Sequence, residues 1–185
     1  MNLLIIRPKE DAEVLSTDLN QIGIKSTIFP IFNFIHLNPL LPNVSEFSNV
    51  IISSRNGIRA FAEKFSERRI TIYVVGEGSA KEAKKHGFKN VIIGNNNIIE
   101  LIKIIKSKLN KDSGKVLNIS GVYQNYDIVT ELGQYGYKIE NLVLYDLIPI
   151  SYLSEGVLKK LENGIINGVL FFSPRSAILF SNLLG

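Results

Sequence analysis

The sequence contains one phrase twice. TDLNQIGIK begins at residue 17 and TELGQYGYK begins at residue 130, 113 positions later, and the two agree at Thr, Leu, Gln, Gly and Lys. The same offset aligns LLIIR at 3–7 with VLNIS at 116–120. A repeat that is longer than a single element indicates that one ancestral half was duplicated. Such repeats usually give a pseudo-twofold pair of lobes with a cleft between them.

A third match extends the repeat. IISSRNGIRAF at 51–61 aligns with LFFSPRSAILF at 170–180, and this pairs Ser54 with Ser173 at an offset of 119. The larger offset implies about six extra residues in the second copy, which we expect around SYLSEGVLKKLENG. In both copies a strand, a serine, a helix and a phenylalanine follow one another, so one duplication explains all three matches.

The pattern between the repeats is that of an α/β chain. Ala12, Leu15, Leu19 and Ile22 follow the spacing of one helix face, and Gly23 ends that helix. The apolar runs lack the polar alternation of half-exposed strands, which indicates parallel sheets covered by helices on both faces. The expected strands are 3–7, 26–32, 49–53, 71–76, 90–94, 115–120, 139–145 and 168–173, with helices near 79–86, 98–109 and 155–162 and another from Ser176.

Composition excludes several classes of protein. There are no cysteines, which removes disulfides and thiol chemistry and weakly favours the cytoplasm. No apolar run approaches the roughly 20 residues of a membrane span, and no secretion signal is recognisable. The net charge of +4 comes from scattered lysines without interleaved aromatics, so we expect no nucleic acid partner.

Four segments, taken in order, resemble the uroporphyrinogen-III synthase family. They are IIRPKEDAEVLSTDLNQIGIKSTIFPIFNF, IISSRNGIRAF, YVVGEGSAKEAKKHGF and VLYDLIPI. The resemblance implies two flavodoxin-like α/β lobes with parallel sheets, joined by a two-stranded linker. One lobe would be discontinuous, made of residues 1–33 and 150–185, and the other would be residues 38–145, with linkers at about 34–37 and 146–149. It also implies a monomer that acts on a tetrapyrrole, hydroxymethylbilane, without a cofactor or metal.

Such a substrate carries many carboxylates and needs many hydrogen-bond donors. Helix N-termini present unpaired backbone N–H groups and a partial positive charge, and parallel sheets bind ligands at the carboxyl ends of their strands. A single serine or asparagine at such a turn is more often an ordinary helix cap. Here, however, four strand-to-helix turns carry such residues, all at the carboxyl ends of their strands. The expected substrate-binding residues are Ser54, Arg55, Asn56, Gly76, Gly78, Ser79, Ser120, Gly121, Ser173 and Arg175.

The resemblance also assigns a role to Tyr145. It matches the tyrosine that the family places beside the linker, and its implied role is general acid for the departing hydroxyl. Without the resemblance, a tyrosine at a strand end packed on an apolar neighbour would be the preferred interpretation. Family members tend to carry Arg-Gly after the VLNI strand, whereas this chain has Ser120-Gly121, which puts one of the family's side-chain donors in doubt.

The second copy departs from the first. After FSNLLG nothing corresponds to TIYVVGEGSAKEAKKHGFKNVIIG, so the discontinuous lobe is expected to have three strands where its partner has five. An exposed parallel edge and an uncovered apolar face would follow. Either further sequence follows Gly185 or this copy is degraded and the lobe is truncated.

Two other interpretations stay open. The first is a non-catalytic two-lobe binding protein or an inactive, truncated synthase. The second is a nucleotide-dependent enzyme, because GEGSAKEA follows a strand and opens a helix, but Lys81 stands where the third glycine belongs. His36 and His86 are too few and too far apart in the sequence to predict a metal site.

Overall fold

The computed structural model describes residues 1–95 and 97–185 and divides into two compact units. Unit 1 consists of Met1–Ile35 and Leu147–Gly185, and unit 2 consists of His36–Asp146. The boundaries expected from the sequence fall a few residues inside these. In the part of the chain that is described, no helix is long and apolar enough to cross a membrane.

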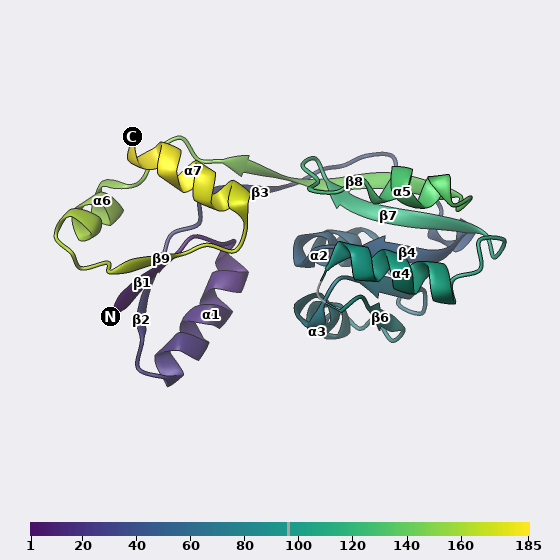
Figure 1. Cartoon of the computed structure of the whole chain (residues 1–185), viewed down its shortest axis with the longest axis horizontal. Helices are drawn as coiled ribbons and strands as arrows, with labels where there is room; N and C mark the ends of the chain where they lie inside the picture. The colour runs from purple at the N-terminus through teal and green to yellow at the C-terminus, as the bar shows by residue number, and fades with distance from the viewer. Residues whose placement is uncertain (96) are drawn as a thin grey trace. The chain divides into compact units, whose positions relative to one another are not determined.

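Unit 2 is built on a parallel sheet (Figure 1). Its strands run in the order β8-β7-β4-β5-β6, and β3 lies outside β8. The five strands from β8 to β6 pair in parallel. The strands of unit 2 are β4 (Phe47–Ile52), β5 (Thr71–Val74), β6 (Val91–Ile93), β7 (Lys115–Gly121) and β8 (Ile139–Pro149), and its helices are α2 (Arg55–Lys64), α3 (Glu77–Lys85), α4 (Ile98–Lys108) and α5 (Ile128–Gln134), with a 3-10 turn at Val44–Glu46. Most of β3 (Phe32–His36) and the last residues of β8 belong to unit 1.

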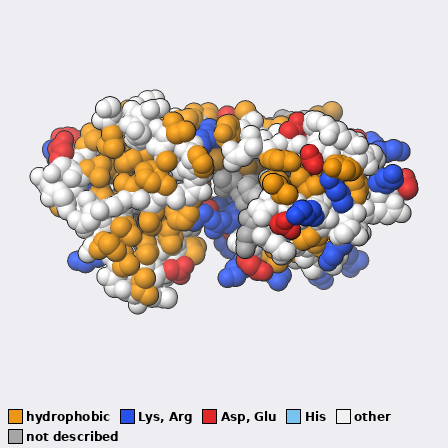
Figure 2. Space-filling model, in the orientation of Figure 1, with side chains coloured by type: hydrophobic (Ala, Val, Ile, Leu, Met, Phe, Trp, Pro, Cys, Tyr) orange, Lys and Arg blue, Asp and Glu red, His pale blue; other side chains and the backbone are white. Residues whose placement is uncertain are grey.

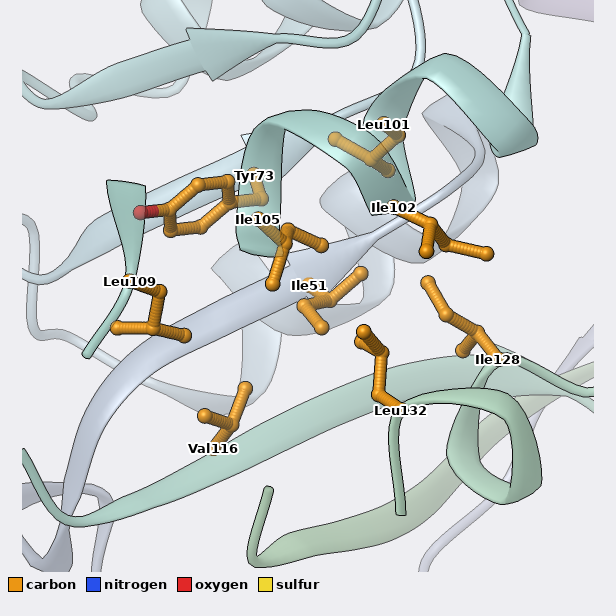
Figure 3. Close-up of a cluster of buried hydrophobic side chains, with 9 residues drawn as sticks. All are labelled: Ile51, Tyr73, Leu101, Ile102, Ile105, Leu109, Val116, Ile128 and Leu132. Carbon is orange, nitrogen blue, oxygen red and sulfur yellow. The ribbon is translucent and has the colours of Figure 1, made fainter. Parts of the chain in front are cut away.

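Helices cover both faces of this sheet. Ile51 of β4 is fully buried beneath α4 and α5, in a cluster of nine buried side chains that Figure 3 shows. The other face packs against α2 and α3, where the ring of Phe61 lies 5.7 Å from that of Phe88. Coverage on both faces explains why β4 is apolar at consecutive positions instead of alternate ones.

The outermost pair, β3 and β8, is antiparallel. The N–H of Leu37 donates to the carbonyl of Leu144 at 2.8 Å, and the N–H of Ile150 donates to that of Ile31 at 3.1 Å. Residue numbers increase along one segment and decrease along the other, so the two segments are antiparallel. These segments are the ones expected to form the two-stranded linker.

Unit 1 is built on three parallel strands. The order is β2-β1-β9, and all pairs are parallel. Leu4 and Ile6 lie in a buried cluster with side chains of α6 and α7, including Val157 and Phe180. The elements are β1 (Asn2–Ile5), α1 (Lys9–Gln21), β2 (Lys25–Ile28), α6 (Glu155–Glu162), β9 (Gly168–Leu170) and α7 (Pro174–Leu184).

The strand register reproduces the sequence repeat. In unit 1, Leu3 is paired with Ser26, and in unit 2 the residues 113 positions later, Val116 and Ile139, are paired with each other. On the other side of the central strand, Leu4 pairs with Val169, and the equivalent pair is Leu117 with Val50. The duplication therefore preserved both neighbours of the central strand, β1 or β7, in the same register.

The helix ends repeat in the same way. Gly23 and Gly136 both have a left-handed φ, of +76° and +86°. After α1 the N–H of Ile24 donates to Leu19, and after α5 the N–H of Tyr137 donates to Leu132. This is the Schellman arrangement, in which a glycine adopts the left-handed conformation that other residues disfavour. The two glycines are helix stops, as expected.

The two sheets differ in what lies beyond β4 and β9. β4 pairs with β5 on its outer side, whereas among residues 1–95 and 97–185 no strand pairs with the outer side of β9. Phe171, just after β9, is 46% exposed, while its counterpart Ile52 is fully buried. Figure 2 shows hydrophobic side chains gathered on the surface of unit 1. The expectation of three strands with an exposed edge against five is confirmed.

Several expected boundaries are wrong: α3 begins at Glu77 and not near Ser79, β9 ends at Leu170 and not at 173, and two further errors have a clear local reason. α7 begins at Pro174 and not at Ser176, because Ser173 caps it and proline fits the first helical position, where no N–H is needed. The apolar run 26–32 is not one strand, since β2 ends at Ile28 and Phe32 begins β3. Pro30 lies between them and has no N–H to donate to a ladder.

Candidate functional site

Ser54 joins β4 to α2 in unit 2. Its backbone is extended, and its side chain accepts a hydrogen bond from the N–H of Gly57 at 2.9 Å. Serine is suited to this position because its short hydroxyl reaches the third helical N–H, which otherwise has no partner. The cap places the Ser54 hydroxyl at the carboxyl end of β4 and at the positive end of the α2 dipole.

Tyr145 lies on β8 with its ring against Gly121 of β7. A Cβ atom at residue 121 would lie 2.7 Å from Cε2 and 2.8 Å from Cζ of the ring, closer than real Cβ atoms approach. The backbone N–H of Val122 donates to the carbonyl of Tyr145 at 3.0 Å. The β7–β8 register shifts after Ser120, which brings Gly121 opposite Tyr145. Glycine is thus required at 121 for the ring to occupy this place.

The hydroxyls of Ser54 and Tyr145 are hydrogen-bonded at 2.8 Å. Tyr145 is buried, at 8% exposure. Burial raises the pKa of the Tyr145 hydroxyl above its ordinary value, and hydrogen bonds with Ser54 and with the Gly121 backbone oppose that rise only in part. At neutral pH the phenol therefore keeps its proton and is in the form that a general acid requires.

The start of α2 lies beside the start of α3. β4 and β5 are parallel neighbours, so their carboxyl ends are adjacent, and the side chain of Arg55 lies about 3.9 Å from where a Cβ of Gly78 would be. Gly76 is the N-cap residue of α3 without a side-chain cap bond, and Ser79 lies in the first turn. The Oδ1 atom of Asn56 accepts a hydrogen bond from Arg59 at 3.3 Å.

Ser120 lies elsewhere than expected. We expected it in a strand-to-helix turn, but β7 continues through Gly121, and Ser120 is only 5% exposed. Among the described residues its hydroxyl has no hydrogen-bond partner. The turn comes later because Asp127, not Ser120, caps the next helix by accepting from Thr130 at 3.0 Å. Ser120 as a substrate-binding residue stays a prediction.

Ser173 and Arg175 form a separate group in unit 1. Ser173 caps α7 by accepting from the N–H of Ser176 at 3.2 Å. The guanidinium of Arg175 lies 4.7 Å over the ring centre of Phe32 and donates to the carbonyl of Leu147 at 3.0 Å. The paired caps Ser54 and Ser173 thus have the same local geometry, as the repeat indicated.

The two histidines each face a glutamate. His36 lies 3.1 Å from Glu63, and His86 lies 3.2 Å from Glu82. Glu82 also binds Arg59 with two hydrogen bonds, at 2.8 and 3.2 Å, which ties α3 to α2. Within the described residues no group of three or more His, Asp and Glu side chains could hold a metal ion.

Three features of the site were not found from the sequence. Carrying the 113-residue offset onward aligns Tyr145 with Phe32, so the phenol has a phenyl counterpart in unit 1. Carrying the 119-residue offset onward aligns Gly57 with Ser176, the two residues whose N–H groups bind the caps. Both pairs follow from the repeat and could have been found there. The Ser54–Tyr145 contact had no signal, because 91 residues separate the two side chains.

Comparison with known proteins identifies the family. The family model of uroporphyrinogen-III synthase HemD matches residues 13–185. The chain belongs to this family. It is 21% identical over 206 residues to the uroporphyrinogen-III synthase of Chlorobaculum parvum, covering 99% of this chain and 79% of the relative. It is 23% identical over 190 residues to the porphyrin biosynthesis protein HemD of Ruminiclostridium josui, covering 92% of this chain and 37% of that protein.

Solved structures share the fold of this family member. The uroporphyrinogen-III synthetase of Helicobacter pylori has a TM-score of 0.61 and 16% identity, covering 99% of this chain and 78% of that one. A mutant synthase from Thermus thermophilus has a TM-score of 0.55 and 15% identity, covering 97% and 75%. The expected fold class, an α/β chain with parallel sheets like those of the synthases, is confirmed. The chain spans little more than a third of the Ruminiclostridium protein that it matches.

Proposed function

We propose that this protein is a uroporphyrinogen-III synthase that cyclises hydroxymethylbilane with loss of water and inversion of the last pyrrole ring. In this proposal it is a lyase of tetrapyrrole synthesis, works as a cytoplasmic monomer and uses no cofactor. The observation that carries the proposal is the family match over residues 13–185. The buried, protonated phenol of Tyr145 at the carboxyl end of the unit 2 sheet supports it.

Tyr145 is the acid in the proposed reaction. Its O–H bond breaks as the proton moves to the hydroxymethyl oxygen, the C–O bond breaks, and water leaves. The pyrrole nitrogen supplies the electron pair that stabilises the remaining carbon. The phenolate oxygen keeps the pair of the broken O–H bond until ring closure releases a proton. Since the substrate supplies much of the driving force, a weak acid held in position suffices.

The carboxylates of the substrate need donors, and unit 2 offers them at adjacent strand ends. The first turns of α2 and α3 present backbone N–H groups, and Arg55 lies between them, next to Gly78. Helix N-termini attract anions because their N–H groups lack internal partners and carry a partial positive charge. In this proposal these turns bind carboxylates of the bilane, and Ser173 and Arg175 of unit 1 bind others.

The test is the isomer that forms. Freshly prepared hydroxymethylbilane closes spontaneously to isomer I, so isomer III above background is the expected result of incubation with the protein. Tyr145→Phe is expected to lower the rate of isomer III formation by about 10²- to 10⁴-fold, which is the usual contribution of a positioned acid, while the protein stays folded. An unaltered rate would remove Tyr145 from the acid role.

The alternative is a non-catalytic two-lobe binding protein or an inactive synthase. Among the described residues the sheet of unit 1 has three strands, and no strand pairs with the outer side of β9. That alternative predicts saturable binding of the bilane with isomer I as the only product. A nucleotide-dependent enzyme would instead be protected against thermal unfolding by NAD or FMN, and we expect no such protection.

A further inference from the structure

The dipeptide Asn-Gly occurs three times in the chain, at residues 56–57, 163–164 and 167–168. An asparagine side chain can be attacked by the backbone nitrogen of the residue that follows it. Glycine favours this reaction because it has no Cβ to hinder the approach and leaves the backbone free to rotate. The three dipeptides share this chemistry, so their surroundings decide which of them reacts.

The first dipeptide is packed inside α2. The Oδ1 atom of Asn56 accepts a hydrogen bond from Arg59 at 3.3 Å, and the N–H of Gly57 donates to the Ser54 hydroxyl at 2.9 Å. Gly57 is buried, and a Cβ at this residue would lie 2.8 Å from Cγ2 of Ile52. The nitrogen of Gly57 reaches the side chain of Asn56 only if this packed turn unwinds, so we expect the first dipeptide to be protected.

The third dipeptide is held by both ends of its side-chain amide. The Oδ1 atom of Asn167 accepts from the N–H of Asn2 at 2.9 Å, and its Nδ2 donates to the carbonyl of Gly164 at 2.8 Å. The backbone N–H of Asn167 also donates to the carbonyl of Asn2 at 2.9 Å, and Gly168 pairs with Leu3 in the sheet. Attack would break these bonds together, so we expect this dipeptide to be protected as well.

The second dipeptide lies at an exposed helix end. Asn163 is the C-cap residue of α6, and Gly164 follows it with a left-handed φ of +64°. Both residues are exposed, and among the described residues no hydrogen bond holds the side chain of Asn163. Two backbone hydrogen bonds close the turn, from Gly164 to Leu161 at 3.1 Å and from Ile165 to Lys160 at 2.9 Å. A helix end with so few contacts opens at little cost in free energy.

The closed turn keeps the reacting atoms apart. The ψ angle of Asn163 is 5°, and at this angle the nitrogen of Gly164 does not face Cγ of the asparagine. Rotation about the Cα–C bond of Asn163 brings the two atoms together, and it breaks the hydrogen bond from Gly164 to Leu161. The reaction therefore proceeds from the opened turn, and the free energy of opening sets its rate.

We propose that Asn163 is a site of spontaneous modification, where asparagine becomes aspartate or isoaspartate through a succinimide ring. In the opened turn the Gly164 nitrogen gives its proton to water and forms a bond to Cγ of Asn163. The bond from Cγ to the amide nitrogen breaks, and that nitrogen leaves as ammonia. A water molecule then adds to one of the two ring carbonyls and breaks its bond to the Gly164 nitrogen. Water is the only co-reactant, and no oxidation or reduction takes place.

The product places a carboxylate at the negative end of the α6 dipole, next to Glu162. Isoaspartate also lengthens the backbone by one carbon. The turn lies between Leu161 and Ile166, which both belong to the apolar packing of unit 1. We therefore expect the modification to weaken the end of α6 and to speed local opening of unit 1.

The test is to age the purified protein in mildly alkaline buffer and to map the small mass gain that accompanies loss of ammonia and uptake of water. Asn163 and Asn167 both lie between Lys160 and Arg175, so trypsin leaves them on one peptide, and fragment ions that end between them assign the site. Asn163 is expected to react at least about tenfold faster than Asn56 or Asn167, since tenfold corresponds to only about 1.4 kcal/mol of opening free energy.

The unfolded chain is the matched control. In concentrated urea the three rates are expected to become similar, because all three asparagines precede glycine and no fold protects them. Equal rates at the three sites in the folded protein would overturn the proposal. An Asn163 that reacts in urea but not in the folded protein would overturn it too.

A variant separates the chemistry from its consequence. Asn163→Gln lengthens the side chain by one carbon, so that attack would form a six-membered ring, which closes more slowly. It is expected to abolish the mass gain at this residue. Hydrogen exchange of the β1 amides is expected to be faster in aged than in fresh wild type and unaltered in aged Asn163→Gln. Unaltered exchange in wild type that carries the modification would overturn the expected weakening of unit 1.

Discussion

β4 and β9 are equivalent strands with different surroundings. Each pairs with the central strand of its sheet in the same register, and both lead through a capping serine into a helix. Ile51 of β4 is fully buried, whereas its counterpart Leu170 is only partly buried. In unit 2 the additional elements β5 and α4 pack against β4, and unit 1 has no counterpart of them among the described residues.

The difference shows that a repeated motif specifies register but not burial. Strand pairing depends on the local pattern and the turn chemistry, and both were duplicated. Burial depends on how many elements pack against the strand, and that number differs between the units. The same apolar residue is thus part of a core in one copy and part of a surface in the other, where it contributes less to stability.

The largest expected effect comes from truncating the equivalent side chains. Ile51→Ala should destabilise unit 2 by about 2–5 kcal/mol, because it leaves a cavity in a closed core. Leu170→Ala should destabilise unit 1 by only about 1–2 kcal/mol, since part of that side chain is already in water. Native-state hydrogen exchange measures each, through the slowest amides of β7 and of β1. Equal losses at the two positions would show that the two strands are equally buried in solution.

An intermediate effect concerns the ion pair between Arg59 of α2 and Glu82 of α3. Among the described residues unit 1 has no counterpart of α3, and so it has no equivalent pair. Glu82→Gln should lower the stability of unit 2 by about 1–3 kcal/mol at neutral pH, between the values for exposed and buried pairs. Burial by itself would raise the pKa of Glu82, but the hydrogen bonds and charge of Arg59, together with Lys85 and His86, bring it below its ordinary value of 4.5.

The sign of the pH dependence follows. A carboxyl whose pKa is lower in the folded state contributes its full stabilisation above its unfolded pKa and loses it as the pH falls through the folded value. The difference in unfolding free energy between wild type and Glu82→Gln should therefore be constant near neutrality and shrink below about pH 4.5. Urea titrations of both proteins at several acidic pH values measure it. A difference that grows on acidification would contradict the assignment.

The smallest expected effect separates the two caps. Ser54→Ala and Ser173→Ala should each cost about 0.5–2 kcal/mol through loss of the cap. Ser54→Ala should cost about 0.5–1.5 kcal/mol beyond its cap, because it also loses the hydrogen bond to the buried Tyr145, whereas the further bond of Ser173 goes to the Ser176 hydroxyl within its own helix turn. In a Tyr145→Phe background this excess should disappear, which a double-mutant cycle by denaturant unfolding measures. An excess that persists without the phenol would place its origin in α2 and not in the Tyr145 contact.

Much of the architecture was predicted from residues that act locally. The repeat, the two helix-stop glycines and the three strands of unit 1 against the five parallel strands of unit 2 were all expected and are all observed. Two of the boundary errors arose where residues with special backbone roles overrode the apolar pattern. Pro30 interrupted an apolar run, and Ser173 with Pro174 began a helix two residues early.

The candidate site was predicted less completely. The capping serines could be found because a serine after a strand and before a helix has a known local role, and Ser54 and Ser173 both have it. Ser120 looked the same in the sequence but lies within β7, because the following helix begins only after Asp127. A strand-to-helix turn can be longer than its sequence pattern suggests, so the position of a single serine was ambiguous.

The sequence by itself determined the duplication, the α/β class, the helix stops and the caps, since each is identified from residues close together in the chain. Only the tertiary structure decided that the Tyr145 ring lies on Gly121 and that its hydroxyl meets Ser54. The physical reason is that β4 and β8, which are distant in the sequence, lie on the two sides of β7 in the sheet. A hydrogen bond between side chains 91 residues apart exists only once that sheet has formed.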